Sequence, residues 1–173
     1  MPRTANVARF YLQCDESAAD WPAKQVCDEV NTRLGAALGT EDIIEYGLLE
    51  MRSRVTEPLP DSRLLLAGDA AHLLTPSGAK GLNLAIDDAV DIARSLGAGD
   101  GMHECLARRS AAAWRTQHFS DSLLRLLHLS PQEHEQPDFG LRLRREDLER
   151  LLAHGPDGDL FARRYVGTHD VFV

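Results

Sequence analysis

The chain has 173 residues, of which 43% are hydrophobic, and its formal net charge is −8 at neutral pH. This length and apolar content suit one domain with its own core, whereas the acidic balance argues against nucleic-acid binding, which needs a basic face to neutralise phosphates. No stretch is apolar enough for a signal peptide or a membrane span, so we expect a cytoplasmic protein with no membrane partner.

The first third of the chain alternates between extended and helical patterns. Residues 7–13 alternate in polarity and are aromatic, which predicts a strand. Asp20 is expected to cap a helix that has Pro22 in its first turn and ends at Gly35 or Gly39. Residues 43–55 form a second extended region, and residues 63–67 read as a buried strand.

The rest of the chain is predicted to be helical after a glycine-rich loop. A helix follows that loop, and small and apolar residues recur on one of its faces at three- and four-residue steps: Leu82, Ala85, Ala89, Ala93 and Leu96. The glycines of residues 97–101 end it. Residues 105–127 and 141–152 predict two further helices, the second charged outside and leucine-rich inside, with a polar loop over residues 131–138.

The stretch from residue 64 to residue 83 carries the clearest chemical signal. An apolar segment stops at Asp69, a loop constrained by Pro76 and Gly78 follows, and a helix of small residues begins. Such a loop presents backbone N–H groups and the positive end of a helix dipole, which together suit a polar, electron-rich ligand.

Two side chains of this stretch allow more than one interpretation. A carboxylate that ends a buried strand needs hydrogen-bond donors, which Asp69 would find in a ligand or as the N-cap of the next turn. His72 is expected to be a structural histidine bonded to the backbone rather than a base. No second His or Cys stands at metal-ligand spacing to it, and the three cysteines are widely spaced, so we expect reduced thiols and no metal site.

The same stretch resembles a known motif in residue order and spacing. Gly68-Asp69-Ala70-Ala71-His72, Pro76 and Gly78-Ala79-Lys80-Gly81-Leu82-Asn83 look like the second flavin-binding motif of the single-component, FAD-dependent aromatic hydroxylases. The Gly-Ala-Lys-Gly-Leu-Asn variant is most similar to that of the 4-hydroxybenzoate 3-monooxygenases. Three other segments resemble that group too: Arg9 to Gln13, Arg52 to Pro58, and Tyr165-Val166-Gly167.

The resemblance implies a fold and an activity. The expected fold class is α/β (α+β), a fragment of the FAD/NAD(P)-binding aromatic hydroxylase fold. It comprises a partial substrate-binding sheet and helix (residues 1–60), a flavin-contacting strand-loop-helix (61–98) and a C-terminal helical region (99–173). The implied activity is hydroxylation of 4-hydroxybenzoate to 3,4-dihydroxybenzoate with FAD as cofactor and NADPH as co-substrate.

The resemblance also assigns roles in cofactor binding. Asp69 would accept hydrogen bonds from the ribityl hydroxyls of FAD. The loop and helix start would offer backbone amides to the flavin, above all those of Leu82 and Asn83, and the residues concerned are Gly78, Ala79, Gly81, Leu82 and Asn83. Arg9 corresponds to an arginine near the flavin, and Arg52 to one implicated in pyridine-nucleotide binding.

A second group would handle the substrate. Arg3 and Tyr11 resemble the pair that binds the carboxylate of the aromatic acid. Pro76 matches a proline whose carbonyl lies against the reacting phenol. Tyr165 matches a tyrosine that relays the phenol proton to solvent, which would make the neighbouring ring carbon more nucleophilic. The tyrosine that would partner Tyr165 has no counterpart in this sequence.

The printed sequence contains no Gly-x-Gly-x-x-Gly motif of a dinucleotide-binding βαβ unit, so it resembles only about the C-terminal half of these enzymes. We therefore expect weak or absent FAD affinity and no turnover by this chain alone. The alternatives are a non-catalytic remnant, a half-enzyme that binds a separate N-terminal partner, a homodimer formed through leucine-rich helices such as 123–127, and a hydroxylase of another phenol such as a 3-hydroxybenzoate.

Overall fold

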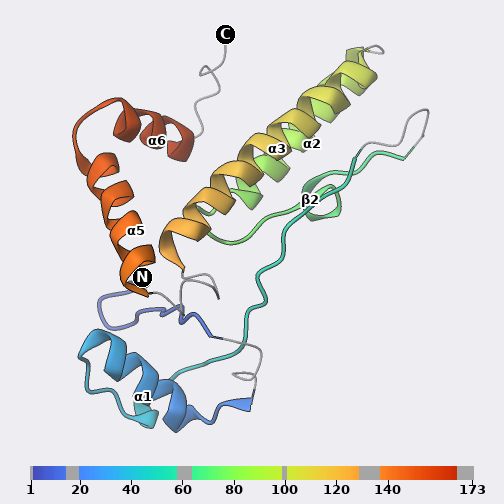
Figure 1. The fold of residues 1–173 in the computed structure, drawn as a ribbon. Coiled ribbons are helices and arrows are strands. Elements are labelled where there is room, and N and C mark those ends of the chain that lie inside the picture. Colours follow the sequence, from blue (N-terminus) through green and yellow to red (C-terminus); the bar gives the residue numbers. More distant parts are fainter. Residues whose placement is uncertain (1, 15–19, 58–63, 99–100, 129–136, 167–173) are drawn as a thin grey trace. The chain divides into compact units, whose positions relative to one another are not determined.

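A computed structural model describes residues 2–14, 20–57, 64–98, 101–128 and 137–166 of the chain (Figure 1). The chain divides into two compact units, Met1–Glu50 and Met51–Val173, and each is described by itself below. Helices occur together with a small antiparallel sheet, which confirms the mixed α/β class. The predicted division at residues 60 and 98 remains a prediction.

The N-terminal unit is organised around one helix, α1 (Ala23–Leu34). The helix ends at Gly35, whose φ of 62° lies in the left-handed region, as the sequence predicts. Its N-cap is Pro22, so the expectation that Asp20 caps it is wrong. The side chain of Asn31 bonds both the backbone N–H and the carbonyl of Leu38, which fastens the following segment and its short 3-10 turn η2 (Thr40–Asp42) to the helix.

The strand predicted over residues 7–13 does not form. Among the described residues of this unit, the sheet-like pairing is one isolated antiparallel bridge between Pro2 and Ala8. Of the extended region predicted over residues 43–55, only β1 (Arg54–Val55) is a strand. A strand needs a neighbour to take up its backbone hydrogen bonds, and alternation of polarity does not supply that neighbour.

The sheet belongs to the C-terminal unit and is short. Strand β1 pairs antiparallel with β2 (His72–Leu73), Arg54 facing Leu73 and Val55 facing His72. The buried strand predicted over residues 63–67 is wrong for residues 64–67, which have no regular structure, and Leu64 is 60% exposed. Arg63 lies outside the described residues. A 3-10 turn, η3 (Gly68–Ala70), leads from this segment into β2.

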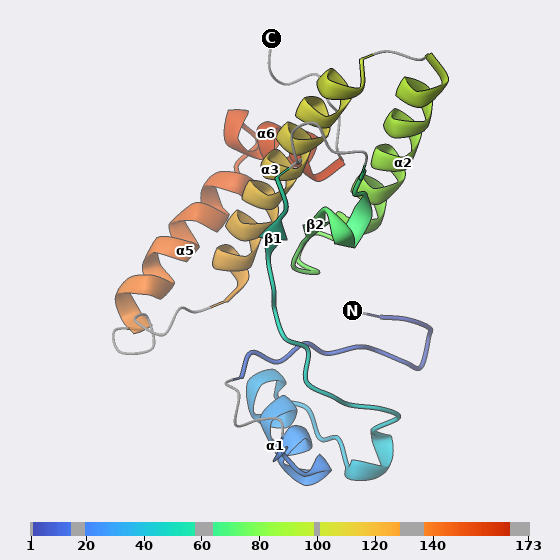
Figure 2. The same cartoon turned by 90° about the vertical axis from the view of Figure 1, so that its right-hand side faces the viewer.

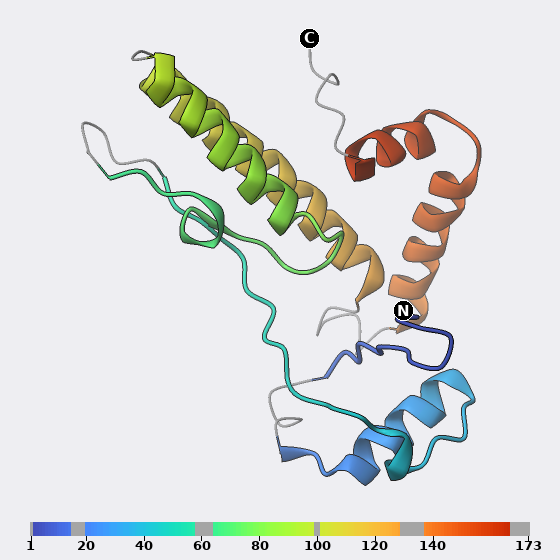
Figure 3. The same ribbon diagram turned by 180° about the vertical axis from the view of Figure 1, so that it is seen from behind.

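The described residues of the C-terminal unit also include helices α2, α3, α5 and α6. Helices α2 (Gly81–Ala98) and α3 (Met102–Leu127) run antiparallel, side by side (Figures 1 and 3). Helices α5 (Pro137–Leu152) and α6 (Pro156–Val166) follow and pack on each other at an angle (Figure 2). The core of the unit contains Leu84, Ala112 and Ala113, against which Val55 and Leu74 pack.

The helices predicted over 82–96, 105–127 and 141–152 are confirmed, but two of their predicted faces are not. Helix α2 buries Leu84 and Asp88, whereas Leu82 and Leu96 of the expected packing face are 73% and 61% exposed. Leu151 of α5 is half-buried, whereas the other leucines that were expected to lie inside are exposed: Leu141, Leu143, Leu148 and Leu152. Helix α6 lies within the helical region predicted over residues 99–173, although the sequence analysis named no separate helix there.

The end of β1 is fastened to α3 by one carboxylate. Glu57 accepts hydrogen bonds from the hydroxyl of Ser110 at 3.2 Å and from the indole N–H of Trp114 at 2.9 Å. These contacts hold the strand beside the middle of the helix. Trp21, the other tryptophan of the chain, lies in the N-terminal unit.

Candidate flavin site

The loop between β2 and α2 has a conformation that requires its glycine. Gly78 has a φ of +87°, and a Cβ added to it would lie 3.2 Å from Cε1 of Phe119 and 3.3 Å from Cδ2 of Leu123. Ala79, which follows, also has a positive φ of 53°. The backbone N–H of Ala79 donates to the carbonyl of Pro76 at 3.1 Å, which closes the loop into a turn lying against α3.

This loop opens directly into the free end of a helix. The backbone N–H of Leu84 donates to the carbonyl of Lys80 at 3.1 Å, the first hydrogen bond of α2. In the part of the chain that the structure describes, the N–H groups of Gly81, Leu82 and Asn83 have no hydrogen-bond acceptor, and the side chains of Leu82 and Asn83 are exposed. The helix therefore offers unbonded donors and the positive end of its dipole to the surroundings.

The side chain of Lys80 connects the loop to α6. Its ammonium donates to the backbone carbonyl of Tyr165 and lies 5.1 Å from the ring centroid of Tyr165 and 5.6 Å from that of Phe119. Lys80 is buried, with 9% of its surface exposed, and this burial lowers the pKa of its ammonium. The structure thus brings the predicted Tyr165 next to the predicted loop.

Asp69 stands in the η3 turn with its side chain exposed. The N-cap of that turn is Ala67, so the alternative interpretation, in which Asp69 caps the turn, is wrong. Within the described residues its carboxylate has no hydrogen-bond or ion-pair partner. The carboxylate is therefore free to accept hydrogen bonds from a ligand, which leaves the flavin interpretation of Asp69 in place.

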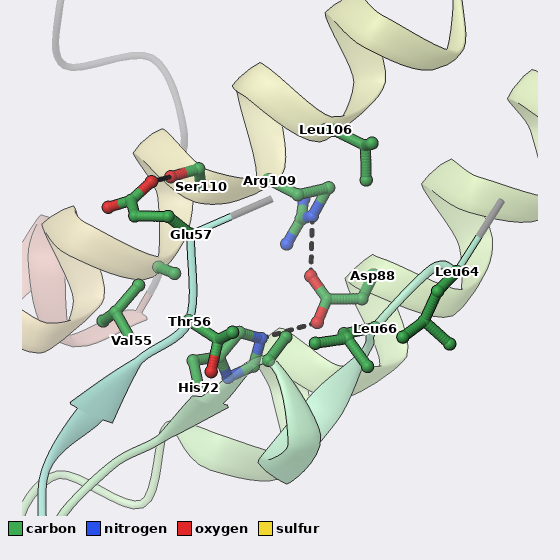
Figure 4. A pocket seen from close by; sticks show the side chains of 12 residues that line it. Val55, Thr56, Glu57, Leu64, Leu66, His72, Asp88, Leu106, Arg109 and Ser110 are labelled. Atoms are coloured by element: carbon green, nitrogen blue, oxygen red, sulfur yellow. Dashed lines mark hydrogen bonds and ion pairs between the residues drawn. The ribbon is translucent and has the colours of Figure 1, made fainter. Parts of the chain in front are cut away.

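Behind the turn lies a buried carboxylate that the sequence analysis missed. Oδ2 of Asp88 lies 2.5 Å from Nε2 of His72 and accepts the backbone N–H of Gly68 at 3.0 Å, while Oδ1 accepts Nε–H of Arg109 at 2.8 Å (Figure 4). Asp88 and His72 are 2% and 3% exposed. His72 was expected to bond the backbone, but the partner of its imidazole is the side chain of Asp88, and its structural role remains a prediction. The sequence did contain a signal for the burial of Asp88, because Asp88 lies one helical turn after the apolar Leu84 and therefore on the same face of α2.

A pocket lies next to this carboxylate, between the sheet and helices α2 and α3 (Figure 4). Apolar side chains form much of its wall, together with His72, Asp88, Arg109 and Ser110. None of the residues predicted to bind cofactor or substrate lines it. Asp69 of the η3 turn and the start of α2, which carry predicted flavin contacts, are thus not part of the wall of this pocket.

The structure gathers a second group of predicted residues in the N-terminal unit. A hydrogen bond from the Arg9 side chain, and the positive charges of Arg9 and Arg3, lower the pKa of the Tyr11 hydroxyl. Tyr11 is 46% exposed, so this cationic group faces solvent. Arg52 is exposed and lies just before β1, in the C-terminal unit.

Membrane-spanning helices and metal sites are both absent from the described residues. No helix there combines the length and apolar character that a membrane span requires. No group of three or more His, Cys, Asp or Glu side chains there is arranged to hold a metal ion. The cytoplasmic location stays a prediction from the sequence.

Comparison with known proteins shows the family to which this chain belongs. Residues 1–117 match the family model described as FAD binding domain. The chain is 31% identical to p-hydroxybenzoate hydroxylase of Acinetobacter baylyi, over 95% of this chain and 43% of that protein. It is also 39% identical to 12-dehydrotetracycline 5-monooxygenase/anhydrotetracycline 6-monooxygenase of Streptomyces rimosus, over 54% of this chain and 19% of that protein.

A third relative is rifampicin monooxygenase of Streptomyces venezuelae, with 34% identity over 57% of this chain and 21% of that protein. The chain thus spans less than half the length of each of these relatives. Each of these relatives is named as a monooxygenase or a hydroxylase, and the names differ in the compound on which the protein acts.

Proposed function

Because this chain belongs to the FAD binding domain family of FAD-dependent aromatic hydroxylases, we propose that it forms the flavin-contacting and substrate-contacting part of a monooxygenase. The proposed substrate is a phenolic aromatic acid, specifically 4-hydroxybenzoate, with NADPH as reductant and 3,4-dihydroxybenzoate as product. The observation that carries the proposal is that the carboxylate of Asp69 and the first amides of α2 have no partner among the described residues.

These two groups fit complementary parts of FAD. The amides of Leu82 and Asn83 would hold the edge of the isoalloxazine that becomes negatively charged on reduction, since helix N-termini stabilise anions. Asp69 would accept hydrogen bonds from the sugar-alcohol chain. Bound FAD would supply the oxygen-transferring chemistry, while the protein positions it, orients the substrate and moves protons. Gly78 and Ala79, both with positive φ, lie in the loop that leads directly into those amides.

The substrate roles follow from the second group. Arg3 and Tyr11 would pair the carboxylate of the aromatic acid, and Arg9, beside Tyr11, would lie near the flavin. The carbonyl of Pro76 already accepts the amide of Ala79, so its direction is fixed and its second lone pair can face a phenol. Tyr165 would pass the phenol proton to solvent. Arg52 is assigned to pyridine-nucleotide binding by resemblance.

FAD is expected to bind weakly to this chain, because its sequence lacks the Gly-x-Gly-x-x-Gly motif that would hold the pyrophosphate. The contacts proposed above concern only the isoalloxazine and the sugar-alcohol chain. Riboflavin, which consists of those two parts, should therefore bind about as well as FAD does.

This expectation gives a direct test. Equilibrium dialysis of the chain against riboflavin and against FAD, followed by visible absorbance, should give two similar and large dissociation constants. ADP should not compete with either flavin for binding. Asp69→Asn should weaken the binding of riboflavin and of FAD by about tenfold or more, because a charge-assisted hydrogen bond is lost. Asp159→Asn, an exposed aspartate of α6, is the matched control and should change neither. Equal binding by the wild-type and Asp69→Asn chains would refute the proposal.

A second candidate function is a half-enzyme that works with a separate N-terminal partner or as a homodimer. The observation that favours it is a row of exposed apolar residues at four-residue steps on α2: Leu82, Ile86 and Val90. Sedimentation of the chain alone would show a dimer if the row pairs two copies. If the chain is a monomer and shows no substrate-dependent NADPH oxidation when it is mixed with an N-terminal partner, the remaining alternative is a non-catalytic remnant.

A further inference from the structure

We propose that Asp88 is a positioning residue, which sets the turn carrying Asp69 against the helix whose first amides face the flavin. The inference rests on the proposed function, because it concerns the geometry of the two groups assigned to FAD. Asp88 itself is buried and is not assigned any contact with FAD.

One carboxylate oxygen holds both ends of the turn. Oδ2 of Asp88 accepts the N–H of Gly68, directly before Asp69, and pairs with the imidazole of His72, three residues after it. Within the turn the N–H of Ala71 donates to the carbonyl of Gly68 at 2.9 Å. With both ends fixed and the middle closed on itself, the backbone at Asp69 has little freedom to move relative to Asp88.

The same residue belongs to the helix that carries the free amides. Asp88 lies seven residues after Gly81 on α2, about 10 Å along the helix axis. A helix is stiff over this length, so fixing the turn to Asp88 also fixes it relative to Leu82 and Asn83. Gly68 permits the close approach: its φ is +60°, and an added Cβ would lie 3.3 Å from Cβ of Ala85.

The arrangement requires a carboxylate. Asp88 is 2% exposed, and Arg109 of α3 balances its charge with a hydrogen bond to Oδ1, while the same guanidinium lies 3.7 Å from Asp91. An amide at position 88 would have the same shape but would turn its NH₂ toward either Arg109 or Gly68. Both of these are donors, so one side would always lose its hydrogen bond.

The first test needs no flavin. Hydrogen exchange of the full chain should show amide exchange of residues 67–73 accelerated about tenfold or more in Asp88→Asn and in His72→Leu, because a local opening becomes easier. His72→Gln keeps a donor near the Nε2 position and should restore slow exchange. Asp91→Asn is the matched control: it weakens the ion pairing to Arg109 without touching the turn, and should leave residues 67–73 unchanged.

The control separates positioning from general support of the fold. A merely structural role would accelerate exchange throughout α2 and α3, and Asp91→Asn would then resemble Asp88→Asn. That pattern, or unchanged exchange of residues 67–73 in Asp88→Asn, would overturn the inference.

The second test reads riboflavin binding by dialysis. Asp88→Asn should weaken binding about as much as Asp69→Asn does, while Asp91→Asn should not. If Asp69→Asn loses binding and Asp88→Asn keeps it, the inference fails and the proposed function stands. If the wild-type chain does not bind riboflavin, or Asp69→Asn binds equally, the proposed function fails and with it the flavin role of Asp88. Hydrogen exchange still decides independently whether Asp88 holds the turn.

Discussion

Replacing Gly78 by alanine tests whether the loop before α2 is as constrained as its geometry indicates. The substitution forces a side chain into a φ of +87°, which costs about 1–2 kcal/mol. The new Cβ would also lie 3.2 Å from the ring of Phe119, and overpacking of this kind costs about 1–3 kcal/mol. The free energy of unfolding of the C-terminal unit should therefore fall by about 2–5 kcal/mol.

Urea denaturation followed by far-ultraviolet circular dichroism measures this change. Substitutions at two other glycines separate the backbone cost from the overpacking cost. Gly101 has a φ of +70° with no atom within 4 Å of an added Cβ, so Gly101→Ala carries the backbone cost alone. Gly97 lies within α2 in open space, and Gly97→Ala should stabilise by about 0.5–1 kcal/mol. If Gly78→Ala costs no more than Gly101→Ala, the contact with Phe119 is not real and the reasoning is refuted.

Three further predictions concern the same loop and the N-terminal unit. Ala79→Gly should stabilise the chain by about 0.5–1 kcal/mol in urea denaturation, since relief of the positive φ exceeds the entropic cost of glycine, and a loss of stability would contradict it. Arg9→Gln should raise the pKa of Tyr11 toward 10.0, the ordinary value of a tyrosine, in an ultraviolet titration, because the hydrogen bond and the charge that lower it are removed; an unchanged titration would count against that contact. For Lys80 the folded pKa lies below the unfolded one, so the unfolded state binds more protons and stability rises as pH increases toward 10.5. Lys80→Met should lack this rise and should lose the hydrogen bond to Tyr165, and equal pH slopes in both chains would disprove the assignment.

The parts of the structure that follow from local chemistry were predictable. Gly78 and Pro76 mark a constrained loop, and the spacing of apolar residues marks the helices, because both signals depend on neighbouring residues alone. The end of α1 at Gly35 is of the same kind. The motif around Asp69 could likewise be located from residue order.

What depends on distant partners was not predictable. The segment 7–13 has the pattern of a strand but no ladder to join among the described residues of its unit. The buried face of α2 was misjudged because Asp88 looks like a surface residue until Arg109 and His72 are brought to it by the fold. The contact of Lys80 with Tyr165 spans 85 residues and has no counterpart in any local pattern.

The placement of the two tryptophans gives each unit its own intrinsic fluorophore. Trp114 shares a hydrogen bond with Glu57, so its emission should change when β1 leaves α3, while Trp21 reports on the neighbourhood of α1. Trp21→Phe and Trp114→Phe would each leave a single emitter. The order in which the halves of this molecule melt can thus be recorded optically, without attaching a dye.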